Sequence, residues 1–234
     1  MKQQELDKII GKFNIKKIKK IYDSNIWFIV IPEESKVVYK CFFKEDVYKR
    51  ELFFYNLFKK ENILIPDYKV LWNIDGIFVL ELENVRLDFP RQKKIELISL
   101  EKIANVLLSI HSININNYLL PVHTKWKNLI LWDIHSSNFF RKKLDFKLWI
   151  YDFSSCKTWD IEEDIANMYI EFKLDQSIFE EFLIYYKKEV NILKVYNYCI
   201  KELYERIKNG MNLDSSKKKL YYTFLTKIKL KLWK

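Results

Sequence analysis

Two carboxylates and an amide lie near one another in the middle of the chain. Asp133 and Asn138 are five residues apart, and Asp152 follows after a stretch long enough to form a short hairpin. A carboxylate such as Asp133 can orient the proton of an attacking hydroxyl, whereas the amide and the second carboxylate offer the hard oxygen ligands that Mg²⁺ prefers. This combination favours phosphoryl transfer from a magnesium-bound nucleoside triphosphate to a hydroxyl group.

The first half of the chain predicts a small antiparallel sheet. Apolar and β-branched runs separated by turn residues indicate three short strands within residues 16–43. Residues 68–73 and 76–83 then predict a hairpin, because Asp75-Gly76 is a dipeptide that favours a tight turn between strands. We therefore expect five strands before residue 84.

One helix is expected between these two groups of strands. Asp46 can cap a helix that runs through residues 47–58, in which Leu and Phe repeat at helical spacing. In this arrangement Lys40 lies on a strand and Glu51 lies on the helix that follows it.

The pattern becomes helical after residue 84. Apolar residues at helical spacing predict a helix over 95–112, and a strand over 145–151 would deliver Asp152 at its end. The change near residues 84–90 predicts a domain boundary, with an N-terminal domain over 1–84 and a C-terminal domain over 85–234. Further helices are expected over 161–172, 178–190 and 192–208, and a basic segment follows them.

Composition limits the class of protein. The chain has 234 residues, of which 49% are hydrophobic, so it can bury a sizeable core in one domain or a bilobed pair. Only three glycines and four prolines argue against collagen-like, linker-rich and many-turned all-β designs. Cys41, Cys156 and Cys199 follow no zinc or disulfide pattern, and neither an apolar signal core nor a membrane span of ~20 apolar residues is evident. We expect a protein of the reducing cytoplasm.

The charge is strongly positive. The formal net charge is +10, and basic residues gather within 16–20 and within 217–234. One interpretation is that these lysines only solvate the surface. The other is an anionic partner, and the apolar and aromatic residues between the lysines of the last segment favour peripheral contact with an anionic membrane surface, at the inner membrane face. No nucleic-acid-binding signature accompanies them, so no nucleic acid is expected.

The order of these parts resembles the protein-kinase-like fold, and within it the branch of aminoglycoside phosphotransferases, choline kinases and lipopolysaccharide-core sugar kinases. That branch typically carries His-Gly-Asp-Leu-His-Pro-Gly-Asn, then a strand and Ile-Asp-Phe. The resemblance extends over about residues 16–172. The matching residues are Leu131-Trp132-Asp133-Ile134-His135-Ser136-Ser137-Asn138 and Tyr151-Asp152-Phe153.

The resemblance implies an α+β, bilobed fold, with an N-terminal antiparallel sheet plus one helix and a mainly helical C-terminal lobe. It implies ATP and Mg²⁺ as cofactors, Asp133 as the catalytic residue, and Asn138 with Asp152 as metal ligands. Lys40 would reach the α- and β-phosphates while Glu51 holds its ammonium in place. The alternative for this last pair is an ordinary edge-strand lysine and a solvated glutamate.

Other positions are matched more weakly. Glu81, Leu82 and Glu83 fall where the resembling proteins have the segment between the lobes, whose backbone groups would pair with adenine. Asp164 is expected to brace the catalytic loop, and His111 is expected to be a structural histidine. His135, which marks the small-molecule branch, is also interpreted as a brace of that loop rather than as a base.

Two departures from the pattern affect the functional prediction. The expected nucleotide-covering turn, residues 22–26, contains no glycine, and Trp132 stands where glycine is usual, immediately before Asp133. The leading hypothesis is an ATP-dependent kinase of a small-molecule hydroxyl, with a sugar of a cell-surface glycolipid as the favoured acceptor. The alternatives are an inactive pseudokinase that binds nucleotide or a partner, an aminoglycoside kinase and a protein kinase.

Overall fold

The computed structural model describes residues 3–84, 99–120, 128–132, 134, 138–141, 148–153, 155–209 and 215–232. The chain forms two compact units. The first combines Met1–Gln92 with Phe139–Ser154, and the second combines Lys93–Asn138 with Ser155–Lys234. The segment that ends in Asp152 therefore packs with the N-terminal unit. The boundary that the sequence predicts near residue 84 stays a prediction.

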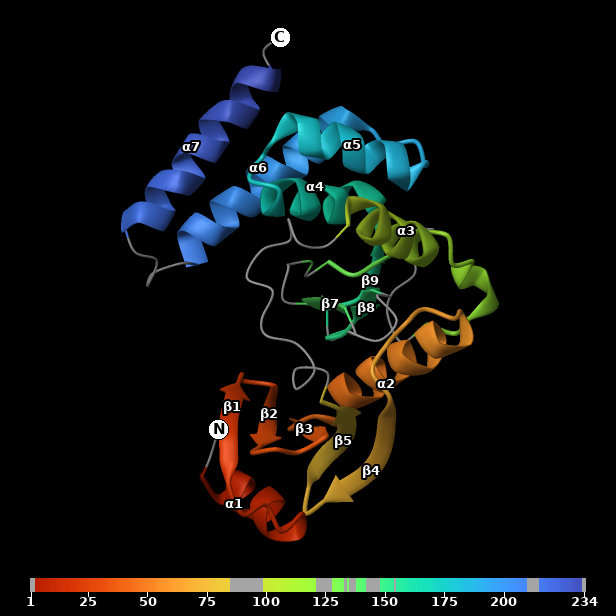
Figure 1. Ribbon diagram of the computed structural model, residues 1–234, viewed down its shortest axis with the longest axis vertical. Coiled ribbons are helices and arrows are strands. Elements are labelled where there is room, and N and C mark those ends of the chain that lie inside the picture. The colour runs from red at the N-terminus through yellow and green to blue at the C-terminus, as the bar shows by residue number, and fades with distance from the viewer. Residues whose placement is uncertain are drawn as a thin grey trace. The chain divides into compact units, whose positions relative to one another are not determined.

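A five-stranded antiparallel sheet forms the centre of the first unit, and it confirms the predicted strands and hairpin (Figure 1). At the hairpin turn both Asp75 (φ 49°) and Gly76 (φ 88°) have positive φ, the conformation that a two-residue turn between twisted strands requires. The strands, in the spatial order β1-β2-β3-β5-β4, are β1 (Ile18–Asp23), β2 (Trp27–Pro32), β3 (Val37–Phe42), β4 (Tyr68–Ile74) and β5 (Ile77–Glu83).

Helix α1 (Gln3–Lys12) covers one face of this sheet, and the sequence analysis did not predict it. Its buried side chains Leu6 and Ile9 belong to the same apolar cluster as Phe28 of β2 and Cys41 of β3. The spacing of three residues between Leu6 and Ile9 is a helical signal that was available in the sequence.

Helix α2 (Glu45–Lys60) covers the opposite face, which confirms the predicted helix. The ring of Tyr48 on α2 contacts Phe42 of β3 and Phe78 of β5, with ring centroids 5.7 and 5.4 Å apart. The predicted cap is wrong, because the helix begins after Lys44 and Asp46 lies inside its first turn. An acidic residue at that place still interacts favourably with the helix dipole.

The segment before Asp152 forms a short hairpin within the first unit. Strands β7 (Phe139–Arg141) and β8 (Leu148–Ile150) pair antiparallel, and the N–H of Ile150 donates to the carbonyl oxygen of Leu64 at 3.0 Å. The predicted strand over 145–151 is thus confirmed at residues 148–150, and residues 145–147 lie outside the described part.

The second unit is mainly helical, as predicted, with one short strand pair formed by β6 (Asn128–Ile130) and β9 (Lys157–Trp159). Asp175 caps one helix, since its carboxylate accepts hydrogen bonds from the N–H groups of Ser177 and Ile178. None of the helices in the described ranges is long and apolar enough to cross a membrane. The helices are α3 (Leu100–His111), the 3-10 turn η2 (Ile115–Asn117), α4 (Ile161–Glu171), α5 (Gln176–Tyr186), α6 (Ile192–Asn209) and α7 (Ser215–Leu232).

Candidate functional site

Three charged side chains meet inside the first unit. The ammonium of Lys40 lies 2.7 Å from Oε1 of Glu51 and 2.9 Å from Oδ1 of Asp152. The exposed fractions of the three side chains are 1% for Lys40, 0% for Glu51 and 20% for Asp152. Charged groups are almost never buried without partners or a function, so this cluster is the strongest candidate site in the described part of the molecule.

Strand alternation places Lys40 in this cluster. Successive side chains of a strand point to opposite faces, so Tyr39 and Cys41 enter the cluster under α1 while Lys40 points to the α2 side. Glu51 lies on the buried side of α2 and meets Lys40 there. The predicted pairing of these two residues is therefore present in the structure.

Aromatic rings surround the ammonium of Lys40. Its Nζ lies 4.9 Å from the ring centroid of Trp27 and 5.6 Å from that of Phe42. Aromatic faces attract a cation electrostatically, so the two rings help to compensate for the lost hydration of the ammonium. Trp27 was not among the site residues predicted from the sequence, because within an apolar strand it is indistinguishable from a core residue.

Phe153 fixes the position of Asp152. Its ring is fully buried and contacts Tyr55 and Phe58 of α2, with centroid distances of 4.7 and 4.8 Å. Asp152 itself has a positive φ of 68°, a conformation that Asp tolerates better than most residues. The anchored ring and this local turn of the backbone hold the carboxylate of Asp152 toward Lys40.

The cluster carries one negative charge more than positive charge. Burial raises the pKa of Glu51 to about 7, the positive charge of Lys40 opposes that shift, and the negative charge of Asp152 adds to it. Burial alone would lower the pKa of Lys40, but the two carboxylates outweigh it and raise that pKa. In the described residues, Oε2 of Glu51 has no hydrogen-bond partner, which favours its protonated form.

The raised pKa of Glu51 predicts a dependence of stability on pH. Its ordinary pKa is 4.5, so between pH 4.5 and about 7 the folded chain holds a proton that the unfolded chain releases. This contribution is complete below pH 4.5 and is lost as the pH rises through 7. We expect the free energy of unfolding of the wild type, relative to Glu51→Gln, to fall by on the order of 1–3 kcal/mol from pH 5 to pH 8.

Urea denaturation of both proteins at several pH values measures this difference. Titrating groups distant from Glu51 are shared by the two proteins, so they cancel in the comparison. A difference between the two proteins that stays constant from pH 5 to pH 8 would contradict the assignment of the proton to Glu51.

A second buried cluster lies in the other unit. Asp164 of α4 is fully buried, and its carboxylate accepts hydrogen bonds from the N–H groups of Leu131 (2.8 Å) and Trp132 (2.7 Å). Nε2 of His111 lies 3.0 Å from the same carboxylate, and Nδ1 of His111 lies 2.6 Å from the hydroxyl of Tyr186. The structure thus confirms Asp164 as a brace of the backbone before Asp133, and His111 as a structural histidine.

Trp132 is held in a strained conformation by this network. Its φ is 67°, which costs an L-residue roughly 1–2 kcal/mol. Asn167 donates from Nδ2 to the carbonyl oxygen of Trp132 at 2.8 Å, so both backbone groups of Trp132 are bonded to α4. The positive φ at this position explains why glycine is usual there in the resembling proteins, since glycine adopts positive φ without strain.

Asn167 was not among the site residues predicted from the sequence. It stands three residues after Asp164, so both lie on one face of α4, and that spacing was a signal that could have found it. Strained backbone that the surrounding structure over-determines is concentrated at functional sites. Trp132 directly precedes Asp133, so the strained backbone lies next to the predicted catalytic residue.

Comparison with solved structures gives matches over nearly the whole chain. Choline kinase LicA from Streptococcus pneumoniae has a TM-score of 0.66 at 14% identity, covering 96% of this chain and 99% of the other. A ternary complex of aminoglycoside phosphotransferase APH(2'')-IIa with streptomycin and ATP has a TM-score of 0.58 at 13% identity, with coverage of 89% and 92%. The chain has the protein-kinase-like fold.

A third kinase-like match is aminoglycoside phosphotransferase APH(3'')-Id from Streptomyces rimosus, with a TM-score of 0.61 at 11% identity and coverage of 84% of this chain and 95% of the other. No protein-family model matches the chain, and no curated protein matches it in sequence. The small-molecule kinases are therefore similar to this chain in fold, with only 11–14% identity in these three comparisons. The fold inferred from the sequence is confirmed.

The remaining predicted site residues are placed less completely. Asp133 and His135 lie outside the described residues. Asn138 is buried in the second unit, with 7% of its surface exposed. Its assignment as a metal ligand, like that of Asp133 as the catalytic residue, stays a prediction.

The predicted adenine-binding segment forms the end of β5. Leu82 is paired with neighbours on both sides, Val38 and Tyr68, and the N–H groups of Glu83 and Asn84 donate within the first unit. Glu81 stands opposite Tyr39 and Lys69. The part that Glu81, Leu82 and Glu83 play in nucleotide binding stays a prediction.

The described acidic side chains can supply part of a ligand set for Mg²⁺. Within the described ranges, no group of three or more His, Cys, Asp or Glu side chains is arranged to hold a metal ion. Mg²⁺ seldom uses such a cage, because it is usually bound by one or two carboxylates together with water and phosphate oxygens. Asp152, the least buried residue of the charged cluster, fits that kind of ligand set.

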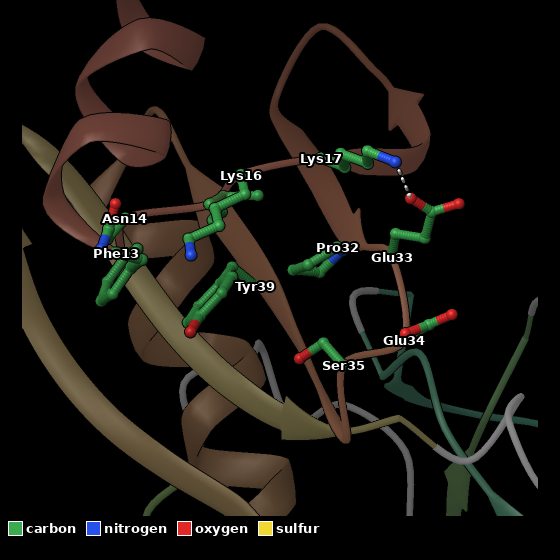
Figure 2. Close-up of a pocket in the computed structure, with 10 residues that line it drawn as sticks. Phe13, Asn14, Lys16, Lys17, Pro32, Glu33, Glu34, Ser35 and Tyr39 are labelled. Atoms are coloured by element: carbon green, nitrogen blue, oxygen red, sulfur yellow. Dashed lines mark ion pairs between the residues drawn. The ribbon is translucent and has the colours of Figure 1, made fainter.

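A hollow of about 540 Å³ lies on the other side of β3 (Figure 2). Lys16, Lys17, Glu33 and Tyr39 are among the residues that line it, and Figure 2 shows the ammonium of Lys17 pointing toward Glu33. Tyr39 precedes Lys40 and therefore points away from the α2 side of the sheet. The hollow is separate from the charged cluster, and the ion pair of Lys17 with Glu33, at 3.7 Å, balances part of its charge.

Proposed function

We propose that the chain is an ATP-dependent phosphotransferase that phosphorylates a hydroxyl group of a small molecule. The observation that carries this proposal is the buried cluster of Lys40, Glu51 and Asp152. It joins a lysine, its counter-charge and a metal-binding carboxylate, the parts that phosphoryl transfer requires. Support for the substrate class comes from the similar structures, which include a choline kinase and an ATP-bound aminoglycoside phosphotransferase.

In this proposal the charged cluster binds the nucleotide. Lys40 holds the α- and β-phosphates, and Glu51 keeps its ammonium in position through the 2.7 Å ion pair. Asp152, with Asn138 as a second oxygen donor, holds Mg²⁺, which when bound neutralises charge on the phosphate oxygens. The carboxylate of Asp152 would supply an oxygen ligand to the metal, and in the structure the same carboxylate contacts the ammonium of Lys40 at 2.9 Å.

Asp133 orients the acceptor hydroxyl. The hydrogen bonds from Leu131 and Trp132 to Asp164 fix the backbone immediately before Asp133, and Asn167 fixes the carbonyl that joins Trp132 to it. A fixed backbone lowers the cost of holding the carboxylate within hydrogen-bond reach of the acceptor.

The charges near Trp132 favour an acceptor without positive charge. The ammonium of Lys157 lies 3.8 Å from the ring centroid of Trp132, one residue from Asp133. Glu163, which could attract a cationic acceptor, is paired with Lys157 at 3.0 Å and with Lys201 at 3.7 Å. We therefore propose a neutral or anionic acceptor, with a sugar hydroxyl of a cell-surface glycolipid as the favoured case, rather than an aminoglycoside.

Nucleotide binding is tested by thermal unfolding with ATP, with and without Mg²⁺. We expect ATP with Mg²⁺ to raise the Tm more than ATP with EDTA, because a ligand that binds only the folded state stabilises it. Asp152→Asn should abolish the difference between the two conditions. Asp46→Asn, an exposed site on α2, is the matched control and should retain it.

Transfer is tested by release of ADP with a panel of sugars, glycolipids, choline and aminoglycosides. ADP release that depends on a sugar and is absent with the cationic acceptors supports the full proposal. A Tm shift without any acceptor-dependent transfer would favour a nucleotide-binding pseudokinase instead. Absence of any Mg²⁺-dependent shift would overturn the nucleotide site itself.

A further inference from the structure

Helix α7 combines a high positive charge with apolar residues around its circumference. Its 18 residues, Ser215–Leu232, include no acidic residue. Phe224, Leu225 and Ile228 are buried, and α7 packs against α6 (Figure 1). A surface helix normally confines its apolar residues to the side that faces the core.

Large apolar side chains of α7 also face away from that buried side. Tyr222 is 56% exposed and Leu230 is 60% exposed. They are eight residues apart, so with 3.6 residues per turn their directions differ by about 80°, and both lie on the half of the helix that faces away from the buried Ile228. Leu220 is 43% exposed, one turn before the buried Phe224. The outer side of α7 is therefore apolar as well as basic.

Lysines flank the two exposed apolar residues. Lys219 precedes Tyr222 by three residues and Lys229 precedes Leu230 directly, and both lysines are exposed. The Nζ of Lys229 lies 3.0 Å from the hydroxyl of Tyr204 on α6, which extends this surface with a half-exposed aromatic ring. We refer to Lys219, Tyr222, Lys229 and Leu230 as the outer face of α7.

We propose that the outer face of α7 docks the protein on an anionic membrane surface. The lysines would contact lipid phosphates and carboxylates, while Tyr222 and Leu230 enter the boundary between headgroups and acyl chains. This combination of basic and apolar side chains on a helix that cannot span a membrane is typical of an interfacial helix.

The positive charge of the outer face of α7 favours a membrane over a second copy of the chain or a nucleic acid as the binding partner. A second copy of the chain would bring the same lysines and a net charge of +10, so repulsion opposes pairing through this face. A nucleic acid would satisfy the lysines and stack on Tyr222, but it would leave the aliphatic side chain of Leu230, which has no flat ring, without a partner. An anionic membrane is attracted by the lysines and also buries the exposed apolar groups.

Flotation of the full chain with vesicles tests the proposal. We expect the chain to bind vesicles of phosphatidylcholine with about 30% phosphatidylserine, whose surface is anionic like that of a cytoplasmic leaflet. Binding to vesicles of pure phosphatidylcholine should be weaker, and binding to the anionic vesicles should be lost in high salt. Lys219→Glu with Lys229→Glu should lower the partition coefficient by about 20-fold or more, because each lysine near such a surface strengthens binding several-fold.

Two further variants separate charge from insertion. Lys12→Glu with Lys69→Glu makes the same change in net charge on exposed residues of the first unit and should bind like the wild type. Tyr222→Ser with Leu230→Ser keeps all lysines and should also weaken binding to anionic vesicles. Circular dichroism and the Tm confirm that each variant is folded.

The proposal is overturned by any of three results. The first is wild-type binding that does not depend on phosphatidylserine, and the second is equal loss of binding in the two lysine variants. The third is binding of a fluorescent single-stranded oligonucleotide that needs Lys219 and Lys229 while the vesicles remain unbound. None of these measurements depends on phosphotransfer, so the docking proposal and the proposed function fail separately.

Discussion

Replacing Asp133 by Asn is expected to lower kcat by about 10²–10⁴-fold, the usual contribution of a positioned general base. An amide has the shape of the carboxylate but cannot accept the proton of the attacking hydroxyl. Nucleotide binding should persist, because Lys40, Glu51 and Asp152 are unchanged and lie together in the first unit. The measurement is single-turnover phosphotransfer with an acceptor identified by the ADP-release screen, beside the ATP-induced Tm shift.

Asp46→Asn serves as the control, since it makes the same chemical change at an exposed position. Loss of turnover in Asp133→Asn with the Tm shift retained is the expected pattern. Full turnover in Asp133→Asn would remove Asp133 from the proposed mechanism, whether or not the ATP-induced Tm shift is retained.

Replacing Asp164 by Asn is expected to lower the free energy of unfolding by about 3–5 kcal/mol, the range seen when one partner of a buried charged network is removed. The carboxylate accepts from two backbone N–H groups and contacts His111; the contacts with Leu131 and His111 are buried, and the contact with Trp132 is partly buried. An amide can accept at only one end, so its NH₂ group would face a donor, leaving at least one buried N–H without a partner.

Urea denaturation measures this loss, and Asp46→Asn is again the matched control. Asp46 and Asp164 both lie in the first turn of a helix, so the control accounts for the interaction with the helix dipole. A loss below about 1 kcal/mol for Asp164→Asn, the level of a single ordinary hydrogen bond, would show that the brace is not held by this carboxylate.

Local pattern predicted the secondary structure well. Apolar and β-branched runs bounded by turn residues identified β3, the Asp75-Gly76 turn identified the hairpin of β4 and β5, and helical spacing identified α2. These features depend on residues close together in the chain. The one helix that was missed, α1, has its apolar spacing in the same local form, and it was overlooked among the polar residues at the start of the chain.

Contacts between residues that are far apart in the chain could not be predicted from local sequence pattern. Lys40 and Asp152 are 112 positions apart, and only packing of the hairpin from residues 139–154 onto the first unit brings them together. The role of Trp27 beside Lys40 has the same origin. Such contacts depend on which faces of the elements pack, and this is not encoded within any single segment.

The residues before Asp133 show most clearly what the sequence determined and what the tertiary structure decided. By itself the sequence determined the residue types of a phosphotransfer motif, the fold that they imply, and the anomaly of Trp132 in place of glycine. The tertiary structure decided that Trp132 has a positive φ and that Asp164 and Asn167 of α4 hold its backbone. The physical reason is that backbone strain at one residue persists only when hydrogen bonds from a distant element outweigh it, and those bonds exist only in the folded chain.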